Sequence, residues 1–201
     1  MFLKNPILGK VKKMIKDMIL FGKILYEQGL NHSHSGNISV RDGNEILIKR
    51  HGAMLGYLTK KDIVRINLNN DKKDKLASLE AKVHRAIYLK NSEIKAIAHG
   101  HTIYATVLSL HNKVIKPTDS EGQLYLPQIP VLDCKETIGS DEVAKKIPEL
   151  ISKYKCAIIK GHGAFAAGKN LEQASMYLSV IENASKILYL SKVYKQNEKV
   201  F

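Results

Sequence analysis

Three histidines in the sequence have the type and spacing of metal ligands. His99 and His101 are separated by one glycine and follow the apolar run 94–98. Because alternate residues of a β-strand lie on the same face, two imidazoles at this spacing can converge on one ion. His162 stands between two glycines after a second apolar run, 156–159. Together they predict three nitrogen ligands and an open coordination position, as in catalytic zinc sites.

A glutamate at the start of a predicted helix adds to these candidate residues. Glu80 opens a predicted helix, 79–89, with Ser78 as its N-cap, and shares one helix face with His84. The residue types alone leave simpler explanations open. A single histidine beside an apolar strand is often a core residue, and a glutamate in a first helical turn interacts favourably with the helix dipole.

The surrounding elements are predicted from hydrophobic periodicity and from capping and turn residues. Helices are expected at 7–30, 79–89, 102–111, 141–152 and 171–193, with a short helical turn at 58–62. Strands are expected at 38–41, 45–49, 63–68, 94–99, 156–160 and 164–167, and the segment 117–130 is expected to be irregular. An order with few βαβ repeats predicts an α/β layered domain on a mostly antiparallel sheet.

Length and composition predict a single globular domain over residues 1–201. Hydrophobic residues make up 44% and charged residues 25% of the chain, as is typical of globular proteins. No apolar run is long enough to span a bilayer, and the amino terminus lacks a secretory signal pattern. We therefore expect a cytoplasmic protein without a membrane partner. Cys134 and Cys156 lack metal-binding spacing and are expected to be buried, reduced thiols.

The formal net charge of +13 is the unusual bulk property. The lysines are spread from Lys4 to Lys199 and tryptophan is absent, so the basic residues do not form the clustered pattern of a nucleic-acid interface. We expect no nucleic-acid partner. A positive field that concentrates a small anionic substrate explains the charge, as would a lysine-rich proteome or a thermophilic habit.

Five motifs, in the same order along nearly the whole chain, resemble the class II aldolase and adducin-head family. They are the loop 35–39 (SGNIS), the segment 46–52 (ILIKRHG), the helix start 76–80 (LASLE) with His84, the pair 99–101 (HGH) and the turn 161–163 (GHG). The resemblance implies a three-layer α-β-α domain around a central, mostly antiparallel sheet. It also implies a homotetramer with the active site near a subunit interface.

The resemblance further implies a divalent ion, Zn²⁺ or a similar metal, held by His99, His101 and His162. Glu80 is implied as the catalytic acid and base and as a further metal ligand when no substrate is bound. The implied reaction is reversible cleavage of a ketose phosphate, such as L-fuculose 1-phosphate, into dihydroxyacetone phosphate and an aldehyde. The ion would act as a Lewis acid and stabilise an enediolate.

The family also implies an anion site built from backbone groups and hydroxyls near a helix N-terminus. The substrate-binding positions that correspond to it are Gly36, Asn37, His51, Gly52, Ser78 and Leu79. Two positions depart from the family pattern, because His51 replaces a threonine and Leu79 replaces a serine. A protonated His51, or the charge of Lys49 or Arg50, would compensate, so we still expect a phosphate or another small anion.

Several functions stay open at this point. Ser120 stands where the fuculose-type aldolases carry a tyrosine that donates a proton from a neighbouring subunit, so the aldehyde partner is undefined. A dehydratase or epimerase of the same family would use the same metal site. A noncatalytic, adducin-like binding protein is the alternative of another class. His32 and His34 form a second pair in the loop before Gly36 and are expected to be solvated or to face the substrate.

Overall fold

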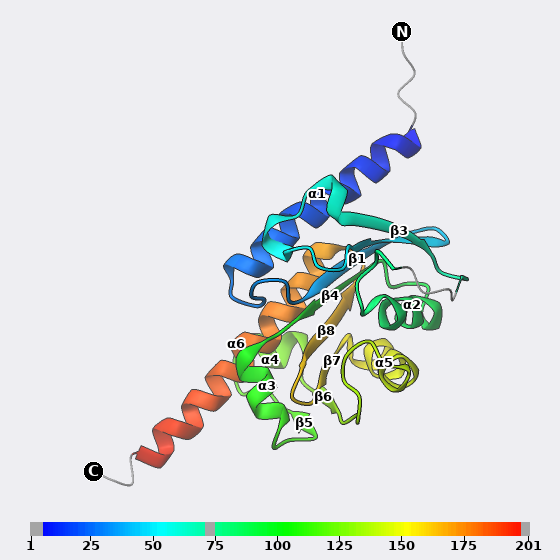
Figure 1. The fold of residues 1–201 in the computed structure, drawn as a ribbon. Coiled ribbons are helices and arrows are strands. Elements are labelled where there is room, and N and C mark those ends of the chain that lie inside the picture. Colours follow the sequence, from blue (N-terminus) through cyan, green and yellow to red (C-terminus); the bar gives the residue numbers. More distant parts are fainter. Residues whose placement is uncertain (1–5, 71–74, 198–201) are drawn as a thin grey trace.

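The computed structural model describes residues 6–70 and 75–197, which form helices on both faces of one large sheet (Figure 1). The strands are β1 (Asn37–Asp42), β2 (Glu45–Lys49), β3 (Ile63–Asn67), β4 (Ala96–Gly100), β5 (Val114–Ile115), β6 (Ile129–Leu132), β7 (Cys156–Ile159) and β8 (Gly163–Gly168). The α-helices are α1 (Pro6–Glu27), α2 (Ala81–Lys90), α3 (Ile103–Ser109), α4 (Ser120–Tyr125), α5 (Asp141–Tyr154) and α6 (Leu171–Asn197). Two 3₁₀ turns, η1 (Leu55–Tyr57) and η2 (Lys60–Asp62), join β2 to β3.

The sheet has the strand order β3-β2-β1-β4-β8-β7-β6-β5. All neighbouring strands are antiparallel except β6 and β7, which are parallel. Helices α2 and α5 cover one face, whereas α1, α3 and α6 cover the other (Figure 1). The predicted α/β architecture with a mostly antiparallel central sheet is therefore confirmed.

Strand β4 shows how the alternation of side chains divides the core. Ala96 and Ala98 belong to the hydrophobic cluster under α1 and α6, and Ile97 belongs to the cluster under α2 and α5. His99 follows this alternation and stacks on Phe165 of the second cluster, with ring centroids 4.1 Å apart. The strand therefore sends the first histidine of the pair to the α2/α5 face at the strand end.

Most of the predicted elements are present because their local signals agree with the tertiary packing. Gly43 adopts a positive φ of 63° in the hairpin turn between β1 and β2. The Ser140 hydroxyl accepts a hydrogen bond of 3.1 Å from the Val143 amide and caps α5. The side-chain oxygen of Asn170 likewise accepts a hydrogen bond of 2.8 Å from the Gln173 amide in the first turn of α6.

The start of α2 differs from the prediction. The helix begins at Ala81, and Ser78 is not its N-cap. The backbone amide of Ser78 instead donates to the carbonyl of Lys49, at 3.0 Å, and Ala77 pairs with Arg50 in an isolated bridge. Because these bonds hold the segment against the end of β2, the chain cannot turn into a helix until after Glu80.

The segment 117–130 is more ordered than predicted. It contains α4 and the first residues of β6, so its assignment as irregular was wrong. The Asp119 carboxylate accepts a 2.8 Å hydrogen bond from the Gly122 amide and caps α4. A helix of six residues leaves too short a periodic pattern to be recognised in the sequence.

Both cysteines are free; Cys156 is buried, as predicted, but Cys134 is only partly buried. Within the described residues, no helix has both the length and the apolar character needed to cross a membrane.

Candidate active site

His99, His101 and His162 meet where the ends of β4 and β8 come together. Their ring centroids lie 4.9 to 5.1 Å apart in all three pairs. One nitrogen from each ring lies within 4.8 Å of the other two. Three imidazoles at these separations can surround a single ion of the size of Zn²⁺.

The hydrogen bonds of His99 define which nitrogen is free to bind a metal. Its Nδ1–H donates to the carbonyl of Ala164 at 3.0 Å, so Nε2 carries the free lone pair. This Nε2 is buried and has no hydrogen-bond partner among the described residues, and the same holds for Nδ1 of His162. Unpartnered buried nitrogens that face one another are what a metal site without its ion would show, so these residues fit a divalent metal.

Burial keeps the three imidazoles neutral, as metal ligation requires. It lowers the pKa of His101 to about 4 and also lowers the pKa of His162. The pKa of His99 lies well below its usual value, because the ring is fully buried and the other two imidazoles lie close to it. The free lone pairs are therefore available at neutral pH.

Gly163 allows β4 and β8 to approach each other closely beside the three histidines. A Cβ at Gly163 would lie 2.4 Å from the carbonyl oxygen of Gly100 and 3.2 Å from the His99 ring. Any other residue would push β4 and β8 apart at the point where the histidines converge. The glycine beside His162 thus has a packing role that its place in the sequence motif did not reveal.

Glu80 lies in the same cavity, at the N-cap position of α2. Only 3% of the residue is exposed, and neither carboxylate oxygen has a hydrogen-bond partner among the described residues. Burial raises the pKa of Glu80 to about 7, and the nearby Gly139 backbone only partly opposes this shift. Glu80 is not a member of the histidine cluster, so its predicted role as a metal ligand stays a prediction.

The loop before α5 closes the cavity against Glu80. Gly139 has a positive φ of 56°, and a Cβ there would lie 2.3 Å from the carbonyl oxygen of Leu79. The glycine therefore lets this loop lie directly on the segment that leads into α2. The adjacent side chain of Ile138 is 62% exposed and forms part of the cavity rim together with Leu79.

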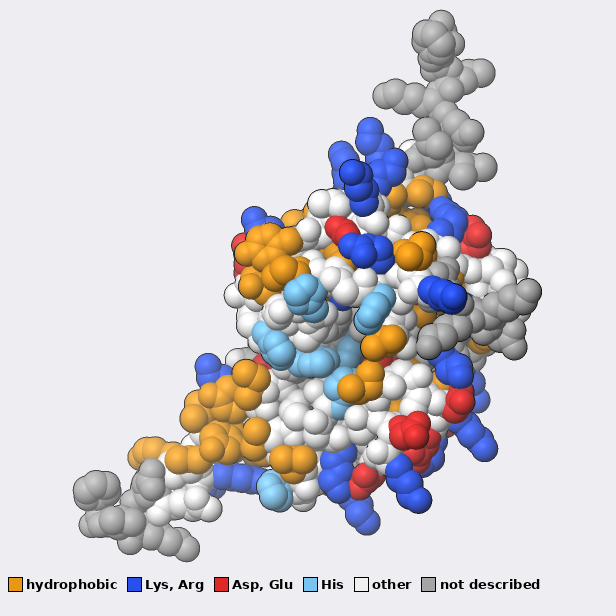
Figure 2. All heavy atoms as spheres, viewed as in Figure 1, with side chains coloured by type: hydrophobic (Ala, Val, Ile, Leu, Met, Phe, Trp, Pro, Cys, Tyr) orange, Lys and Arg blue, Asp and Glu red, His pale blue; other side chains and the backbone are white. Residues whose placement is uncertain are grey.

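The cavity has a volume of about 180 Å³ and brings together every residue that the sequence singled out as metal-binding, catalytic or substrate-binding. Those lining residues are Gly36, Asn37, His51, Gly52, Ser78, Leu79, Glu80, His99, His101 and His162. Figure 2 shows histidine side chains gathered around a hollow near the middle of one face, with hydrophobic side chains at its edge. A wider pocket of about 550 Å³ shares His51, Ser78, Leu79 and Ile138 with the cavity.

Asn37 is held in place by a fully buried polar network. His84 on α2 donates from Nε2 to the Asn37 side-chain oxygen at 2.6 Å, and its Nδ1 bonds to the Ser39 hydroxyl at 2.7 Å. Tyr88 donates to the backbone carbonyl of Ser39 at 3.0 Å. Because the amide oxygen of Asn37 is engaged by His84, its NH₂ group is left available to a ligand.

Three further residues line the cavity: His34, Lys49 and Ile138. The sequence had indicated His34 as solvated or substrate-facing and Lys49 or Arg50 as a compensating charge, whereas it gave no role to Ile138. Arg50 points elsewhere, since its guanidinium bonds to Asp62 at 2.8 Å. Ser120, at the position of the tyrosine proton donor, is exposed on α4 and is not among the cavity-lining residues.

The three histidines and the buried carboxylate of Glu80 line one cavity at the end of a mostly antiparallel sheet, so the site has groups that could hold a metal ion and move a proton. Residues 16–189 match the model of the Class II Aldolase and Adducin N-terminal domain. The protein belongs to this family, as the resemblance of its five motifs implied.

Relatives within the family are enzymes that act on sugar phosphates. The chain is 31% identical over 185 residues to the L-fuculose phosphate aldolase of Methanocaldococcus jannaschii, covering 90% of this chain and 98% of that protein. It is 27% identical to the 3-oxo-tetronate 4-phosphate decarboxylase of Pectobacterium atrosepticum, covering 87% and 83%. The crystal structure of L-fuculose-1-phosphate aldolase from Thermus thermophilus superposes with a TM-score of 0.88 at 30% identity, covering 92% and 97%.

Proposed function

We propose that this protein is a zinc-dependent aldolase that reversibly cleaves a ketose phosphate, such as L-fuculose 1-phosphate, into dihydroxyacetone phosphate and an aldehyde. The observation that carries the proposal is the convergence of three neutral imidazoles, that of His99 buried and those of His101 and His162 partly buried, in one cavity with a buried carboxylate. The relatives named as L-fuculose phosphate aldolases support the substrate class.

His99, His101 and His162 would hold the ion through their free nitrogens. Three imidazole ligands suit zinc and leave a position open to a substrate. When bound, the ion would supply Lewis-acid polarisation of the oxygens of the substrate. The hydrogen bond from His99 to Ala164 fixes the ring orientation, and the stacked ring of Phe165 keeps water from that side of the cluster.

Glu80 would move the proton at the carbon where the bond to the aldehyde is broken or formed. A carboxyl group with a pKa of about 7 is present in both protonation states near neutral pH, so it can donate a proton in cleavage and remove one in condensation. Because neither oxygen is committed to another residue, the proton can be delivered directly to a bound fragment. Asn37, oriented by His84, would donate hydrogen bonds to an anionic or hydroxyl group of the substrate.

A panel of ketose phosphates, incubated with the zinc-loaded protein and analysed by product mass, tests this proposal. We expect dihydroxyacetone phosphate and an aldehyde from at least one ketose 1-phosphate. A product of unchanged mass would indicate an epimerase, and loss of one water a dehydratase. Either result without carbon–carbon cleavage would contradict the aldolase assignment.

Decarboxylation is the second candidate, and the relationship to a 3-oxo-tetronate 4-phosphate decarboxylase favours it over dehydration or epimerisation. Both aldol cleavage and decarboxylation leave an electron pair on a carbon next to a carbonyl group, so the same residues serve either one. The same panel should therefore include a 3-oxo acid phosphate. Release of carbon dioxide from that compound, without aldol cleavage of any ketose phosphate, would replace the first candidate by the second.

A further inference from the structure

The helix that follows His101 is capped by a side chain from a distant part of the chain. Helix α3 starts at Ile103, two residues after His101, and lies beside α6 (Figure 1). The carboxylate of Glu182, on α6, accepts hydrogen bonds from the backbone amides of Tyr104 and Ala105 at 3.0 and 3.1 Å. These amides are among the first four of the helix, which have no partner within it. Each oxygen of Glu182 therefore caps one amide of α3.

The N-cap residue of α3 does not take this role. The side chain of Thr102, at the N-cap position, makes no capping hydrogen bond, and its buried hydroxyl has no hydrogen-bond partner among the described residues. The helix has seven residues, which is too short to be stable by itself in water. The negative charge of Glu182 also interacts favourably with the positive end of the helix dipole. The start of α3 therefore depends on its contact with α6.

Helix α6 also lies directly against the segment that carries the histidine pair. A Cβ at Gly100 would lie 2.7 Å from Cδ2 of Leu178. Leu178 precedes Glu182 by four residues, so both side chains lie on the same face of α6. The His101 amide donates a hydrogen bond of 2.9 Å to the carbonyl of Leu30. His101 thus lies between a backbone hydrogen bond of its own and the capped start of α3.

The other end of α3 is bonded to the turn that carries His162. The hydroxyl of Ser109, in the last turn of α3, accepts a hydrogen bond of 3.0 Å from the Gly161 amide. It also donates to the carbonyl of Thr106 at 2.6 Å, which fixes its orientation. Gly161 directly precedes His162 in the chain. Helix α3 therefore links the position of His101, at its start, to that of His162, at its end.

We propose that Glu182 is a positioning residue of the histidine triad: by fixing the start of α3, it sets the separation of the His101 and His162 imidazoles. Glu182 is not among the cavity-lining residues, so it acts through the backbone of α3. Ligands that are already held at the required separation bind an ion more tightly, because less conformational freedom is lost on binding. This inference rests on the proposed function only for the presence of a divalent ion at the triad.

The test is the affinity of the protein for Zn²⁺, measured by competition with a chromogenic chelator, together with the visible spectrum of the Co²⁺-loaded protein. Glu182→Ala is expected to lower the Zn²⁺ affinity by about tenfold, as does the loss of other contacts that orient metal ligands. The Co²⁺ absorption bands depend on the ligand geometry and should change in position and intensity. Glu182→Gln keeps one acceptor oxygen and should have an intermediate affinity.

Three further variants separate positioning from a general loss of stability. Glu172→Gln changes an exposed glutamate on the same helix. Ile66→Val shortens a buried side chain in β3, at the edge of the sheet, and should lower the melting temperature. Both should keep the wild-type Zn²⁺ affinity and Co²⁺ spectrum. Ser109→Ala removes the hydrogen bond at the other end of α3 and should lower the Zn²⁺ affinity.

Wild-type Zn²⁺ affinity and an unchanged Co²⁺ spectrum in Glu182→Ala would overturn the proposal, as would an equal loss of affinity in Ile66→Val. Where Glu182→Ala does not fold, unchanged affinity in both Glu182→Gln and Ser109→Ala would overturn it. A wild-type protein that binds no Zn²⁺ would contradict this inference and the proposed function together. A wild-type protein that binds Zn²⁺ but cleaves no ketose phosphate would contradict the proposed function alone, because neither measurement uses the reaction.

Discussion

At the scale of single residues, the chemistry depends on the environment of a few side chains rather than on their types. Glu80 and Glu136 are both glutamates, but Glu136 is exposed, whereas Glu80 is buried and burial raises its pKa to about 7. Burial of His99 and partial burial of His101 and His162 lower the pKa values of the three histidines and keep their imidazoles neutral. The imidazoles therefore have lone pairs that could bind a metal ion, and the Glu80 carboxyl group can gain or lose a proton near neutral pH.

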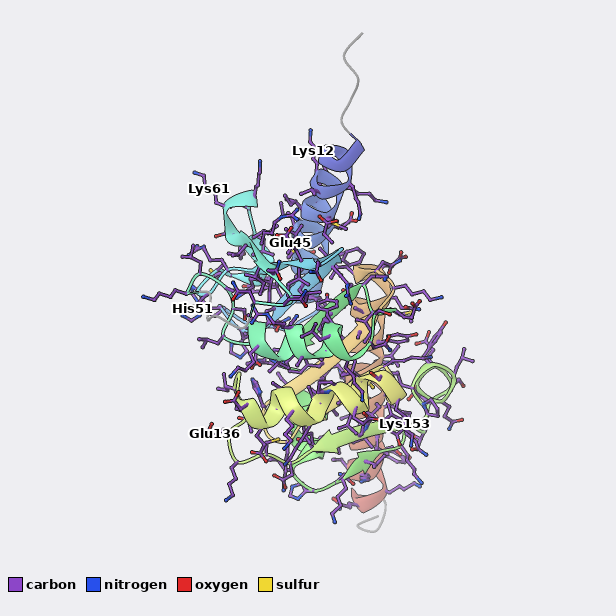
Figure 3. All side chains as sticks on the ribbon, turned by 90° about the vertical axis from the view of Figure 1, so that its right-hand side faces the viewer. Lys12, Glu45, His51, Lys61, Glu136 and Lys153 are labelled. Carbon is purple, nitrogen blue, oxygen red and sulfur yellow. The ribbon has the colours of Figure 1, made fainter. Side chains whose placement is uncertain are left out.

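Glu80→Gln should lower the turnover number of aldol cleavage by about 10² to 10⁴ with the zinc content unchanged, because the amide cannot transfer a proton. Steady-state kinetics and elemental analysis of the same preparation measure both quantities. Glu136→Gln is the control, because it changes an exposed glutamate in the loop that closes the cavity (Figure 3). Wild-type turnover in Glu80→Gln would remove Glu80 from the proton transfer.

The sequence predicted the residues of the cavity better than it predicted their contacts. The spacing of His99 and His101 on a strand and the glycine-flanked His162 were sufficient to propose a triad. Lys49 could not be separated from Arg50 in the sequence, because only the pairing of Arg50 with Asp62 and the burial of Lys49 distinguish them. Long-range contacts of this kind leave no local signal.

At the scale of elements, α2 connects the site to the core. Its first residues follow Glu80, and its buried face carries His84, which positions Asn37 of β1. The sequence predicted this helix but began it too early, because the hydrogen bond between Ser78 and Lys49 belongs to the tertiary structure. Six of the eight strands in the described residues and the capped helix α5 were predicted well, since their periodicity and cap residues are local, whereas β5 and β6 were missed.

Acid should destabilise the protein through His84. Burial lowers the pKa of this residue to about 3 in the folded protein, against about 6.5 in the unfolded chain. Between these values the unfolded chain binds a proton that the folded protein does not bind. The contribution of neutral His84 is therefore complete above pH 6.5 and decreases by up to about 1.4 kcal/mol per pH unit as the pH falls towards 3.

Denaturant unfolding at about pH 7.5, 6.5 and 5.5 measures this effect. His84→Gln should show a shallower loss of unfolding free energy with falling pH than the wild type, whatever its stability at the highest pH. His111→Gln changes an exposed histidine and should keep the wild-type slope. An equal pH dependence in all three proteins would show that His84 does not remain neutral in the folded state.

At the scale of the whole molecule, one sheet separates two hydrophobic clusters, and the site lies at a sheet end between them. The basic side chains visible on the site face are distributed around the histidine-lined hollow (Figure 2). This distribution suits the attraction of a small anion. The homotetramer stays a prediction; exposed hydrophobic residues on α3 and α6, including Ile103, Val107, Leu190 and Tyr194, support it.

The central claim is that the histidine triad binds an ion on which the reaction depends. The most direct test is to measure the zinc content and the rate of aldol cleavage in one preparation, before chelation, after chelation and after zinc is returned. We predict one zinc ion per chain, loss of cleavage with the metal and recovery of both together. Unchanged aldol cleavage in the metal-free protein would contradict the account.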